Sequence, residues 1–412
     1  MITKETSTTV LVFAFDLLAH YTRCLRLAEL LPDDYHFVFQ ASDYDEVVRR
    51  QGFRTFTCQR LPEKDLIAHG CREDVMNWPR ADLEQVMLAQ CAAIERYQPA
   101  FIIGDMSPTL SMAAERTSTY FVSVVNAYLS RHYDAPFIMP DCLPNITTDI
   151  VDVPPFYRNR LTDREGFMAV ARSQKEFRFL RRRYGLTKKL NLALELEGDQ
   201  TWICDTSALH PLRKNLPPEV QQIGPLQFFP RNLPDHESGK TRPGRKTILV
   251  TMGSSGNYEW LWKLEADCFS KYDFLVCGRT SDRALPDHVR YVPFADLNNL
   301  MRRSSLLICH GGNGSLYQAL AAGKPALCVP SFFEQRFNAD CIVKNGWGEI
   351  LTGEPAPQAL LNAIDRLADT GLPGVARHIH DWQNRQPRLL RQLTNQIKFL
   401  TASQLSAMAI TH

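Results

Sequence analysis

The sequence lacks a charge imbalance, a metal-type cysteine pattern and a long apolar run. Its 47 lysine and arginine residues nearly balance 45 aspartate and glutamate residues, giving a net charge of +2, which argues against a dedicated nucleic-acid binder. The 11 cysteines form no C-x-x-C pair and no Cys/His cluster at zinc spacing, which favours a reducing compartment. The first apolar run, residues 10–15, is too short for a signal-peptide core, and no stretch approaches transmembrane length. We therefore expect a soluble, cytoplasmic protein.

What is present is an alternation of short apolar runs and amphipathic segments. The runs are four to seven residues long and rich in β-branched or aromatic types, which predicts buried strands, and the segments between them have helical periodicity. Strand then helix, repeated, predicts an α/β fold with parallel sheets. The expected strands are residues 9–15, 35–41, 100–105, 120–126 and 201–205, and then 247–253, 272–278, 289–294, 306–312 and 326–330.

A chain of 412 residues is too long for one ordinary core. Residues 228–246 hold three prolines and two glycines with few apolar residues, which is typical of a linker. The tail, residues 377–408, has a helical pattern that Pro387 should bend or break. The expected organisation is an N-terminal domain at 1–235, a linker at 236–246, a C-terminal domain at 247–385 and a helical tail at 386–412 that packs back toward the N-terminal domain.

The most informative segment is "CHGGNGSLYQAL", residues 309–320. A parallel strand that runs through glycines into a helix leaves free backbone N–H groups at the helix N-terminus, where phosphate binds. Gly311, Gly312 and Gly314 remove Cβ atoms from the approach, and Ser315 adds a hydroxyl. His310 can donate a further hydrogen bond to an anionic oxygen. Taken alone, the same pattern also fits an ordinary strand-to-helix turn.

The continuation of this segment, "HGGNGSLYQALAAGKPALCVPSFFEQRFNADCIVKNGWGEIL", resembles the donor-binding signature of nucleotide-sugar glycosyltransferases of the GT-B fold. The likeness is to the family of UDP-glycosyltransferases and bacterial macrolide and natural-product glycosyltransferases. It implies two facing Rossmann-like domains with an interdomain cleft. The residues that keep their places are His310, Gly312, Gly314, Ser315, Ala319, Gly323, Pro325, Pro330, Gln335, Asn338 and Ala339.

The resemblance assigns expected roles in the second half of the chain. The turn after the strand at 306–312 would hold the donor diphosphate, together with Ser254 of a second strand-to-glycine turn, "VTMGSSGN". Gln318 would meet the ribose, in a position where the family usually has an acidic residue. By residue, the diphosphate set is His310, Gly311, Gly312, Asn313, Gly314, Ser315 and Ser254, the base and ribose set is Tyr291, Val292 and Gln318, and the donor-sugar set is Glu334 and Gln335.

Two residues of the first half are the expected catalytic pair. The resemblance places a histidine in the turn after the first strand, and His20 stands there in "HYTRCLRLA", similar to a His-x-x-Arg variant of bacterial enzymes. A near-neutral imidazole suits a general base, and Asp105, which closes the strand at 100–105, would orient it. Other interpretations are a solvated helix-start residue for His20 and a helix cap for Asp105. Asp16 is the reserve candidate for the base.

These observations predict an inverting, metal-independent glycosyltransferase. It would move a sugar from a nucleoside diphosphate, for which UDP is the favoured candidate, to a hydroxyl of a small-molecule or lipid-like acceptor. The reaction would need no cofactor and no metal. The turn at 310–315 would stabilise the leaving diphosphate. The alternatives are an epimerase or hydrolase of the same fold, or a catalytically silent sugar-nucleotide-binding partner protein. The protein would be a monomer or a homodimer.

Two weaker features complete the reading. The segment "RSQKEFRFLRRRYGLTKK", near residues 172–189, has eight basic residues in eighteen. A solvated helix face is the simpler interpretation, and a contact with an anionic lipid or a phosphorylated substrate is the other. Trp78 and Met76 lie in an irregular segment that could either contact an acceptor or pack locally.

Overall fold

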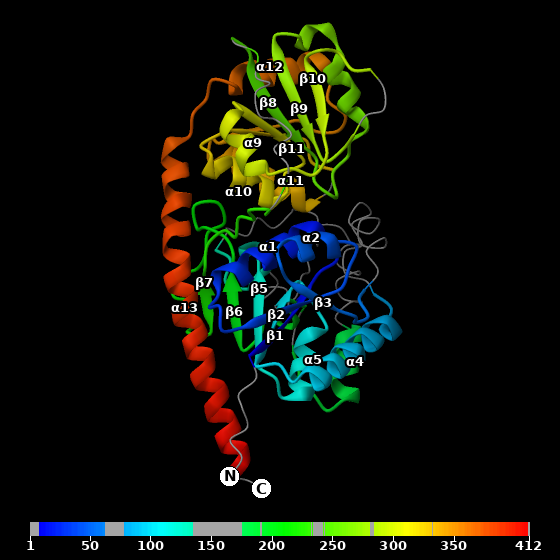
Figure 1. Ribbon diagram of the computed structural model, residues 1–412, viewed down its shortest axis with the longest axis vertical. Helices are drawn as coiled ribbons and strands as arrows, with labels where there is room; N and C mark the ends of the chain where they lie inside the picture. The colour runs from blue at the N-terminus through cyan, green and yellow to red at the C-terminus, as the bar shows by residue number, and fades with distance from the viewer. Residues whose placement is uncertain are drawn as a thin grey trace, which may run out of the picture. The chain divides into compact units, whose positions relative to one another are not determined.

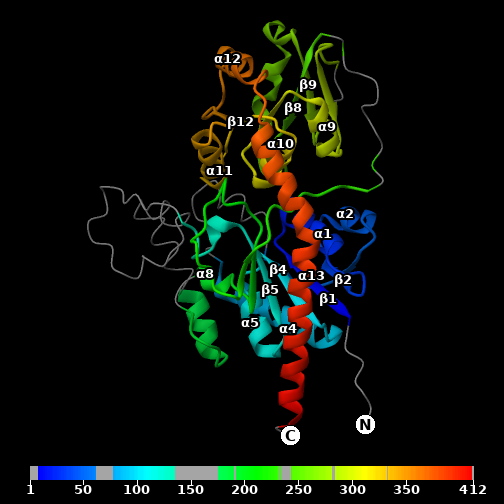
Figure 2. The ribbon, with the colours of Figure 1, turned by 90° about the vertical axis from the view of Figure 1, so that its left-hand side faces the viewer.

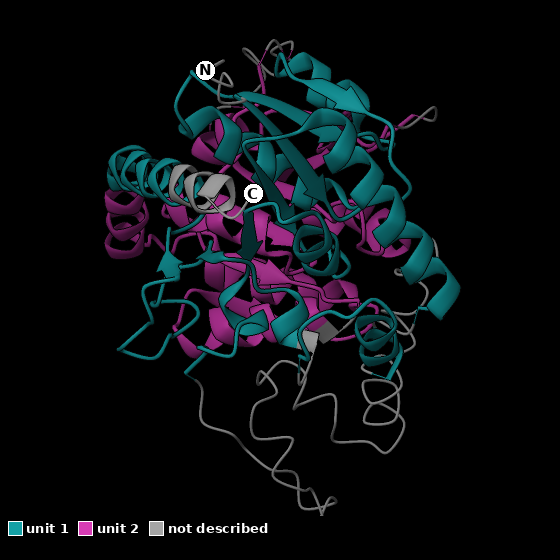
Figure 3. Cartoon of the chain, turned by 90° about the horizontal axis from the view of Figure 1, so that it is seen from below, with its two compact units in different colours: residues 1–226, 383–412 teal, residues 227–382 magenta. Residues whose placement is uncertain are grey.

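The computed structural model describes residues 8–61, 78–134, 175–189, 192–231, 233, 242, 244–280, 284–331 and 333–410 (Figure 1, Figure 2). The chain divides into two compact units (Figure 3). Unit 1 comprises residues 1–226 and 383–412, and unit 2 comprises residues 227–382. The domain limits expected from the sequence, at 235 and 247, stay a prediction.

Unit 1 contains a parallel sheet of seven described strands in the order β3-β2-β1-β4-β5-β6-β7. Apolar residues fill β1 and β4, which are buried almost throughout, as expected of strands covered on both faces. The strand order reverses between β1 and β4, which pair in parallel up to Ala14 and Asp105. Their carboxyl ends therefore lie side by side, where an open sheet of this type binds ligands. The strands are β1 Thr9–Ala14, β2 His36–Gln40, β3 Arg54–Phe56, β4 Phe101–Asp105, β5 Phe121–Val125, β6 Gln200–Ile203 and β7 Val220–Gln222.

Local sequence explains how these elements end and pack. Helix α1 (Leu18–Leu30) stops before Pro32, because a proline cannot continue the helical hydrogen bonding. Gly104 allows β4 to approach α5, since a Cβ atom there would lie 2.5 Å from Cδ2 of Leu110. The other helices described before residue 227 are α2 Asp45–Arg50, α4 Arg80–Tyr97, α5 Leu110–Thr117, the 3-10 turn η1 Ala127–Leu129, residues 175–183 and α8 Leu192–Glu195.

Unit 2 repeats this arrangement with six described parallel strands in the order β10-β9-β8-β11-β12-β13. The order reverses between β8 and β11, which pair up to Thr251 and Cys309. The strands are β8 Lys246–Thr251, β9 Tyr272–Cys277, β10 Val289–Val292, β11 Leu306–Cys309, β12 Ala326–Cys328 and β13 Gly348–Ile350. The helices are η3 Glu259–Glu265, η4 Asp267–Phe269, α9 Leu297–Arg303, α10 Asn313–Ala321, α11 Phe333–Lys344, α12 Pro357–Leu367 and α13 Pro373–Ile410, the last of which continues into unit 1.

The α/β fold and all ten strands expected from apolar runs are confirmed. Each strand is shorter than expected at one end or both, and β6 and β8 also begin one residue earlier. Three strands have no counterpart in those runs: β3, β7 and β13. Each has only three residues and is an outer or near-outer member of its sheet. Strands this short carry too few residues to show a periodicity.

The predicted break at Pro387 is wrong. Helix α13 runs through that residue without interruption (Figure 2). The ring removes one N–H donor and costs about 3 kcal/mol in a helix interior. Burial beyond the proline offsets this cost, because Leu390, Leu393 and Ile397 are each at most 3% exposed. Gln386 adds two hydrogen bonds, from Nε2 to the carbonyl oxygens of Ile223 at 3.0 Å and Pro225 at 2.8 Å.

The basic segment contains a buried arginine, which corrects its interpretation as a solvated face throughout. The Arg181 side chain is 2% exposed, and it forms a two-pronged ion pair with Glu195, with Nε–Oε1 and Nη2–Oε2 distances of 2.7 Å. Its Nη1 atom also lies 2.8 Å from Oε2 of Glu115, and Nη2 donates to Ser111. Arg182 and Arg183, the next two residues, are exposed.

We predict that Arg181→Met lowers the free energy of unfolding by about 3–5 kcal/mol, because it leaves the 3%-exposed carboxylate of Glu195 buried without its cation. Chemical denaturation followed by circular dichroism measures this difference. The matched control is Arg182→Met, one exposed residue further on, which should change the value by no more than about 0.5 kcal/mol. Equal effects of the two substitutions would contradict the buried-pair assignment.

Candidate functional site

The two residues expected to form a catalytic pair lie together at the strand-order reversal of unit 1. His20 is in the first turn of α1, just after β1, and Asp105 is the last residue of β4. Nδ1 of His20 lies 2.8 Å from Oδ1 of Asp105, and their side chains are 15% and 0% exposed. The ring of Phe15 packs edge-on against the imidazole, with centroids 5.4 Å apart. The histidine is therefore held by a buried carboxylate and an aromatic ring.

A third residue, Arg23, belongs to this cluster, and sequence reasoning gave it no role. Its Nε atom donates to Oδ2 of Asp105 at 2.6 Å, and Nη2 donates to Oδ1 of the same carboxylate. Nη1 donates to Oδ1 of Asn126 at 2.7 Å and to Sγ of Cys204 at 3.1 Å. Nη2 also lies 3.1 Å from Nδ1 of His20. The available signal was the spacing of three between His20 and Arg23, which puts both on one face of α1.

Electrostatics hold the centre of this cluster ionised. Burial alone would raise the pKa of Asp105, but Arg23 and then His20 outweigh it and lower the pKa to about 2. Burial alone would lower the pKa of Arg23, yet the Asp105 carboxylate raises it above its ordinary value. Burial also raises the pKa of the thiols of Cys24 and Cys204, which are therefore neutral at physiological pH.

Asp16, the reserve candidate for the base, is only 4% exposed, and its Oδ2 atom lies 2.8 Å from Nε of Arg60. The carboxylate is thus paired with a guanidinium. A nearby Asp-x-Asp tripeptide is similarly engaged: Asp43 pairs with Arg60 at 3.2 Å, and Asp45 pairs with Arg49 at 3.1 Å. Among the described residues, no group of three or more His, Cys, Asp or Glu side chains is placed to hold a metal ion.

The glycine-rich turn of unit 2 lies at the corresponding reversal, between β8 and β11. Gly312 is the N-cap of α10, and Gly311 has a φ of +91°, which favours glycine. A Cβ atom on Gly311 would lie 2.5 Å from the carbonyl oxygen of Gln335, so the α11 segment packs directly on the turn. Nδ2 of Asn338 donates to the carbonyl oxygen of Gly311 at 3.2 Å and fixes the turn from the same side.

His310 is enclosed by glycines at this turn. Cβ atoms added to Gly312, Gly253 and Gly256 would lie 2.3, 2.7 and 2.8 Å from its side-chain atoms. Burial lowers the pKa of His310 to about 4, so the imidazole is neutral at physiological pH. Within the described residues its buried Nδ1 atom forms no hydrogen bond of ordinary geometry, and the backbone of Thr251 partly opposes the lowering of the pKa. A neutral, fixed imidazole beside a helix N-terminus can donate to an anionic oxygen without bringing a charge of its own.

The first turn of α10 provides the backbone donors that the sequence predicted. Asn313, Gly314 and Ser315 are its first three residues, whose N–H groups precede the helical hydrogen-bond pattern. Gly314 is exposed, and no heavy atom lies within 4 Å of a Cβ atom placed there. Gln318, one turn later, is half-buried. This helix end therefore leaves room for a group to approach the backbone.

The residues expected to contact the donor sugar and the nucleotide base differ in burial and in hydrogen bonding. Gln335 is 2% exposed and joins two turns, because Oε1 accepts from the Ser331 N–H at 2.8 Å and Nε2 donates to Ser255 Oγ at 3.3 Å. Its expected contact with a sugar stays a prediction. The remaining residues of these sets are placed as follows: Glu334 is half-buried at the start of α11, Ser254 is exposed after β8, Tyr291 packs partly buried on the core of unit 2, and Val292 is buried with its carbonyl oxygen accepting from the Gly278 N–H at 3.0 Å.

Trp78 is 5% exposed, which supports local packing for this residue, and Met76 lies outside the described residues. In the part of the chain that the structure describes, no helix combines the length and apolarity needed to span a membrane.

Comparison with known proteins finds named glycosyltransferases among the proteins of similar sequence and a shared fold among the solved structures. Residues 244–381 match the model of the glycosyltransferase family 28 C-terminal domain. A PGL/p-HBAD biosynthesis rhamnosyltransferase from Mycobacterium bovis is 24% identical over 345 residues, which cover 82% of this chain and 75% of the relative. The tylactone mycaminosyltransferase of Streptomyces fradiae is 27% identical over 222 residues, covering 50% of this chain and 45% of the relative.

Solved structures share the fold over nearly the whole chain. The calicheamicin glycosyltransferase CalG4 aligns with a TM-score of 0.67 at 16% identity, covering 95% of this chain and 98% of CalG4. The spinosyn rhamnosyltransferase SpnG complexed with thymidine diphosphate aligns with a TM-score of 0.65 at 16% identity, covering 94% of this chain and all of SpnG. At these identities the likeness concerns the fold.

The low pKa of His310 predicts a specific pH dependence of stability. Below pH 6.5 the unfolded chain binds a proton at this residue, whereas the folded protein does so only near pH 4. Stability should therefore fall as the pH drops through this window, by about 3 kcal/mol from this residue. We expect His310→Gln to remove this contribution, so that the wild type loses its advantage over the variant toward pH 4 in chemical denaturation. The control is His36→Gln, at an exposed histidine. A difference in free energy of unfolding between wild type and His310→Gln that stays constant from pH 7 to pH 4 would contradict the assignment.

Proposed function

Because the chain is a glycosyltransferase of the GT-B fold, we propose that it is inverting and metal-independent, with His20 as the general base. The observation that carries this proposal is the pairing of His20 with the buried, ionised Asp105, at 2.8 Å. A carboxylate that accepts from Nδ1 selects the tautomer in which Nε2 has the lone pair, so Nε2 would take the acceptor proton. Unit 1 would supply the base and unit 2 would hold the donor.

The donor diphosphate would bind at the N-terminus of α10. The N–H groups of Asn313, Gly314 and Ser315 and the neutral imidazole of His310 form a set of donors suited to phosphate oxygens. The exposed Ser254, in the turn after β8, would add a hydroxyl. These groups bind the diphosphate in the ground state and stabilise the additional charge on it as the glycosidic bond breaks. No metal is needed for this role.

The reaction that follows is a single displacement. The acceptor oxygen forms a bond to the anomeric carbon, while the bond from that carbon to the diphosphate oxygen breaks and its electron pair leaves with the nucleoside diphosphate. Nε2 of His20 takes the acceptor proton, and the charge on the resulting imidazolium is balanced within the cluster of Asp105 and Arg23. Attack opposite the leaving group inverts the anomeric configuration.

The substrates are proposed by class. Tyr291 and Val292 would meet the nucleotide base, Gln318 the ribose, and Glu334 and Gln335 the sugar. The sequence favours UDP, and the neighbour SpnG was solved with thymidine diphosphate, so both nucleotides belong in the test. Relatives named for glycolipid and macrolide biosynthesis support a hydroxyl acceptor on a small or lipid-like molecule.

We predict that His20→Ala strongly slows transfer while donor binding survives. Sugar transfer from UDP- and TDP-sugars to a panel of phenols and aliphatic alcohols is measured as release of nucleoside diphosphate, and it should fall by about 10²–10⁴-fold. Calorimetry with UDP and TDP should give an unchanged affinity. Gly312→Ala, by contrast, should weaken nucleotide binding, because its Cβ atom would displace the His310 ring.

The control for the glycine substitution is Gly371→Ala, because no heavy atom lies within 4 Å of a Cβ atom there. Unchanged transfer by His20→Ala would show that the base is wrong. Prompt conversion of a UDP-sugar to free sugar or an epimer without an acceptor would favour a hydrolase or epimerase. Binding of nucleotide with no transfer to any acceptor would favour a silent binding protein.

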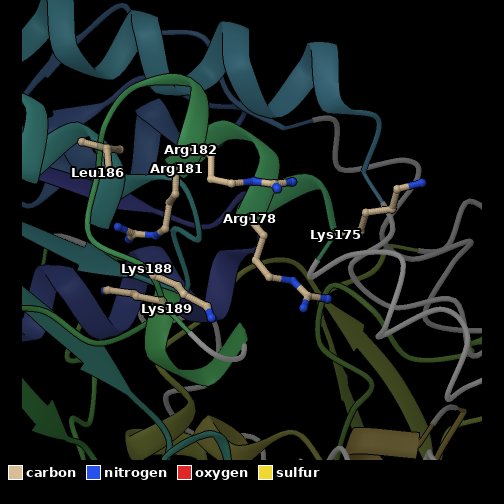
Figure 4. Close-up of a pocket in the computed structure, with 7 residues that line it drawn as sticks. All are labelled: Lys175, Arg178, Arg181, Arg182, Leu186, Lys188 and Lys189. Carbon is tan, nitrogen blue, oxygen red and sulfur yellow. The ribbon is translucent and has the colours of Figure 1, made fainter.

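A second proposal concerns the basic segment near residues 172–189. A cavity of about 400 Å³ is lined by Lys175, Arg178, Arg181, Arg182, Leu186, Lys188 and Lys189 (Figure 4). Lys175, Arg178 and Arg182 are exposed and follow one helical stripe, where like charges repel. No acidic side chain is among the lining residues. We propose that this face binds the phosphate of an anionic lipid headgroup, which would bring the enzyme to a lipid-like acceptor.

Sedimentation with phosphatidylglycerol vesicles tests this proposal. We expect the double substitution Arg178→Gln and Arg182→Gln to weaken binding by roughly tenfold or more, since each basic residue near an anionic surface contributes about 1 kcal/mol. Arg388→Gln with Arg391→Gln removes the same charge from two exposed residues of α13 and is the control. Equal losses in the two double variants would contradict a specific site, and competition by soluble glycerol phosphate would show a free phosphate ligand in place of a membrane surface.

A further inference from the structure

The cluster at the strand-order reversal of unit 1 contains a cation, Arg23, in addition to the histidine–carboxylate pair of His20 and Asp105. In such a pair the carboxylate is the counter-ion of the imidazolium that forms during proton transfer. Here Asp105 already has a counter-ion, because Arg23 contacts both of its oxygens. The side chains of Arg23 and Asp105 are 12% and 0% exposed, so this ion pair is shielded from solvent. The imidazole of His20 therefore faces an ion pair with both charges close by.

The distances give both charges a direct effect on His20. Nδ1 lies 2.8 Å from Oδ1 of Asp105 and 3.1 Å from Nη2 of Arg23. In the proposed tautomer Nδ1 is protonated and donates to the carboxylate, because an ionised carboxylate can only accept. The guanidinium can only donate, so it then lies against Nδ1 without a hydrogen bond to it. When the ring takes a second proton, Asp105 attracts the new charge and Arg23 repels it from a similar distance. The two effects oppose each other in a site of low dielectric constant.

The other groups around this ion pair do not replace Arg23. Asn126 bridges Arg23 to Asp205, since its Oδ1 accepts from Nη1 of Arg23 and its Nδ2 donates to Oδ2 of Asp205 at 3.2 Å. Asp205 also accepts from the Ala127 N–H at 2.6 Å. The thiols of Cys24, 3.8 Å from Oδ2 of Asp105, and of Cys204 are neutral. Arg23 is thus the only cation that contacts His20 in this described cluster, which lies on α1 and at the carboxyl ends of β4, β5 and β6.

We propose that Arg23 is a positioning residue of the reaction, which fixes the Asp105 carboxylate and counters the charge of the His20 imidazolium. This inference rests on the proposed role of His20. It separates two functions that one carboxylate would otherwise combine: Asp105 orients the ring, and Arg23 limits how strongly the ring holds its proton. A base that releases the proton after each turnover is ready for the next acceptor.

The test is the titration of His20 in the full chain, followed by NMR on protein labelled at histidine Cε1 and assigned with His20→Ala. In Arg23→Met the repelling charge is absent, and we expect the midpoint to rise by about one pH unit or more relative to the wild type. In Arg23→Lys the charge remains without the fork, and a smaller rise is expected. Asp105→Asn removes the attracting charge, so its midpoint should fall. The opposite signs distinguish an electrostatic role from a loss of packing.

Arg26→Met is the matched control, because it removes an arginine one turn further along α1 that pairs with Glu29 at 3.4 Å. Its midpoint should equal that of the wild type. If Arg23→Met does not fold, as judged by its melting curve, Arg23→Lys and Asp105→Asn still test the sign of the two shifts. An unchanged or lowered midpoint in a folded Arg23→Met protein overturns the inference about Arg23. Unchanged transfer by His20→Ala overturns the base itself, so the two failures are distinguishable.

Discussion

Both candidate sites depend on one constraint, the reversal of strand order in an all-parallel sheet. In unit 1 the reversal separates β1 from β4, and in unit 2 it separates β8 from β11. At such a point the connections leave toward opposite sides of the sheet, so the carboxyl ends of two adjacent strands are left uncovered. Residues at or just after these strand ends, including His20, Asp105 and His310, are therefore positioned by the pairing of backbone strands.

Pairing alone does not decide which chemistry develops at a reversal, and the two units differ in what fills the space. In unit 1 charged side chains fill it, since Asp105, Arg23 and Asp205 are connected through Asn126. In unit 2 the space is kept by the absence of side chains. Gly253 and Gly312 each lie where a Cβ atom would overlap the His310 ring. In the proposed reaction the first reversal would control charge, and the second would let backbone N–H groups approach an anion.

The sequence was sufficient to predict most strands and which residues lie at their ends. It predicted the partners of individual side chains much less well. Apolar runs located ten of the described strands, and their alternation with helices implied parallel pairing, which brings His20 next to Asp105. The three-residue strands β3, β7 and β13 were missed because they contain charged or amide side chains and are too short to have a period, whereas the equally short β12 lies in an apolar run. The prediction at Pro387 failed because burial of the residues that follow it in the helix outweighed the local effect of the proline.

The same limit applies to the charged residues. Nothing in "KEFRFLRRR" distinguishes Arg181, which is 2% exposed, from its exposed neighbour Arg182, because the difference comes from Glu195 and Glu115. Arg23 was visible only as part of a His-x-x-Arg spacing, and its contacts with Asn126 and Cys204 join segments more than a hundred residues away. Such partners are fixed by tertiary packing, which no local pattern encodes.

The contrast between the two imidazoles shows how the environment assigns roles to one residue type. His310 is buried among glycines without a carboxylate, and burial lowers its pKa to about 4. It therefore remains a neutral donor throughout the physiological range and is unsuited to exchange a proton. His20 contacts an ionised carboxylate and a guanidinium, so that a charge formed on its ring is met by a counter-ion at 2.8 Å. These surroundings are the reason for proposing proton transfer at His20 and anion binding at His310.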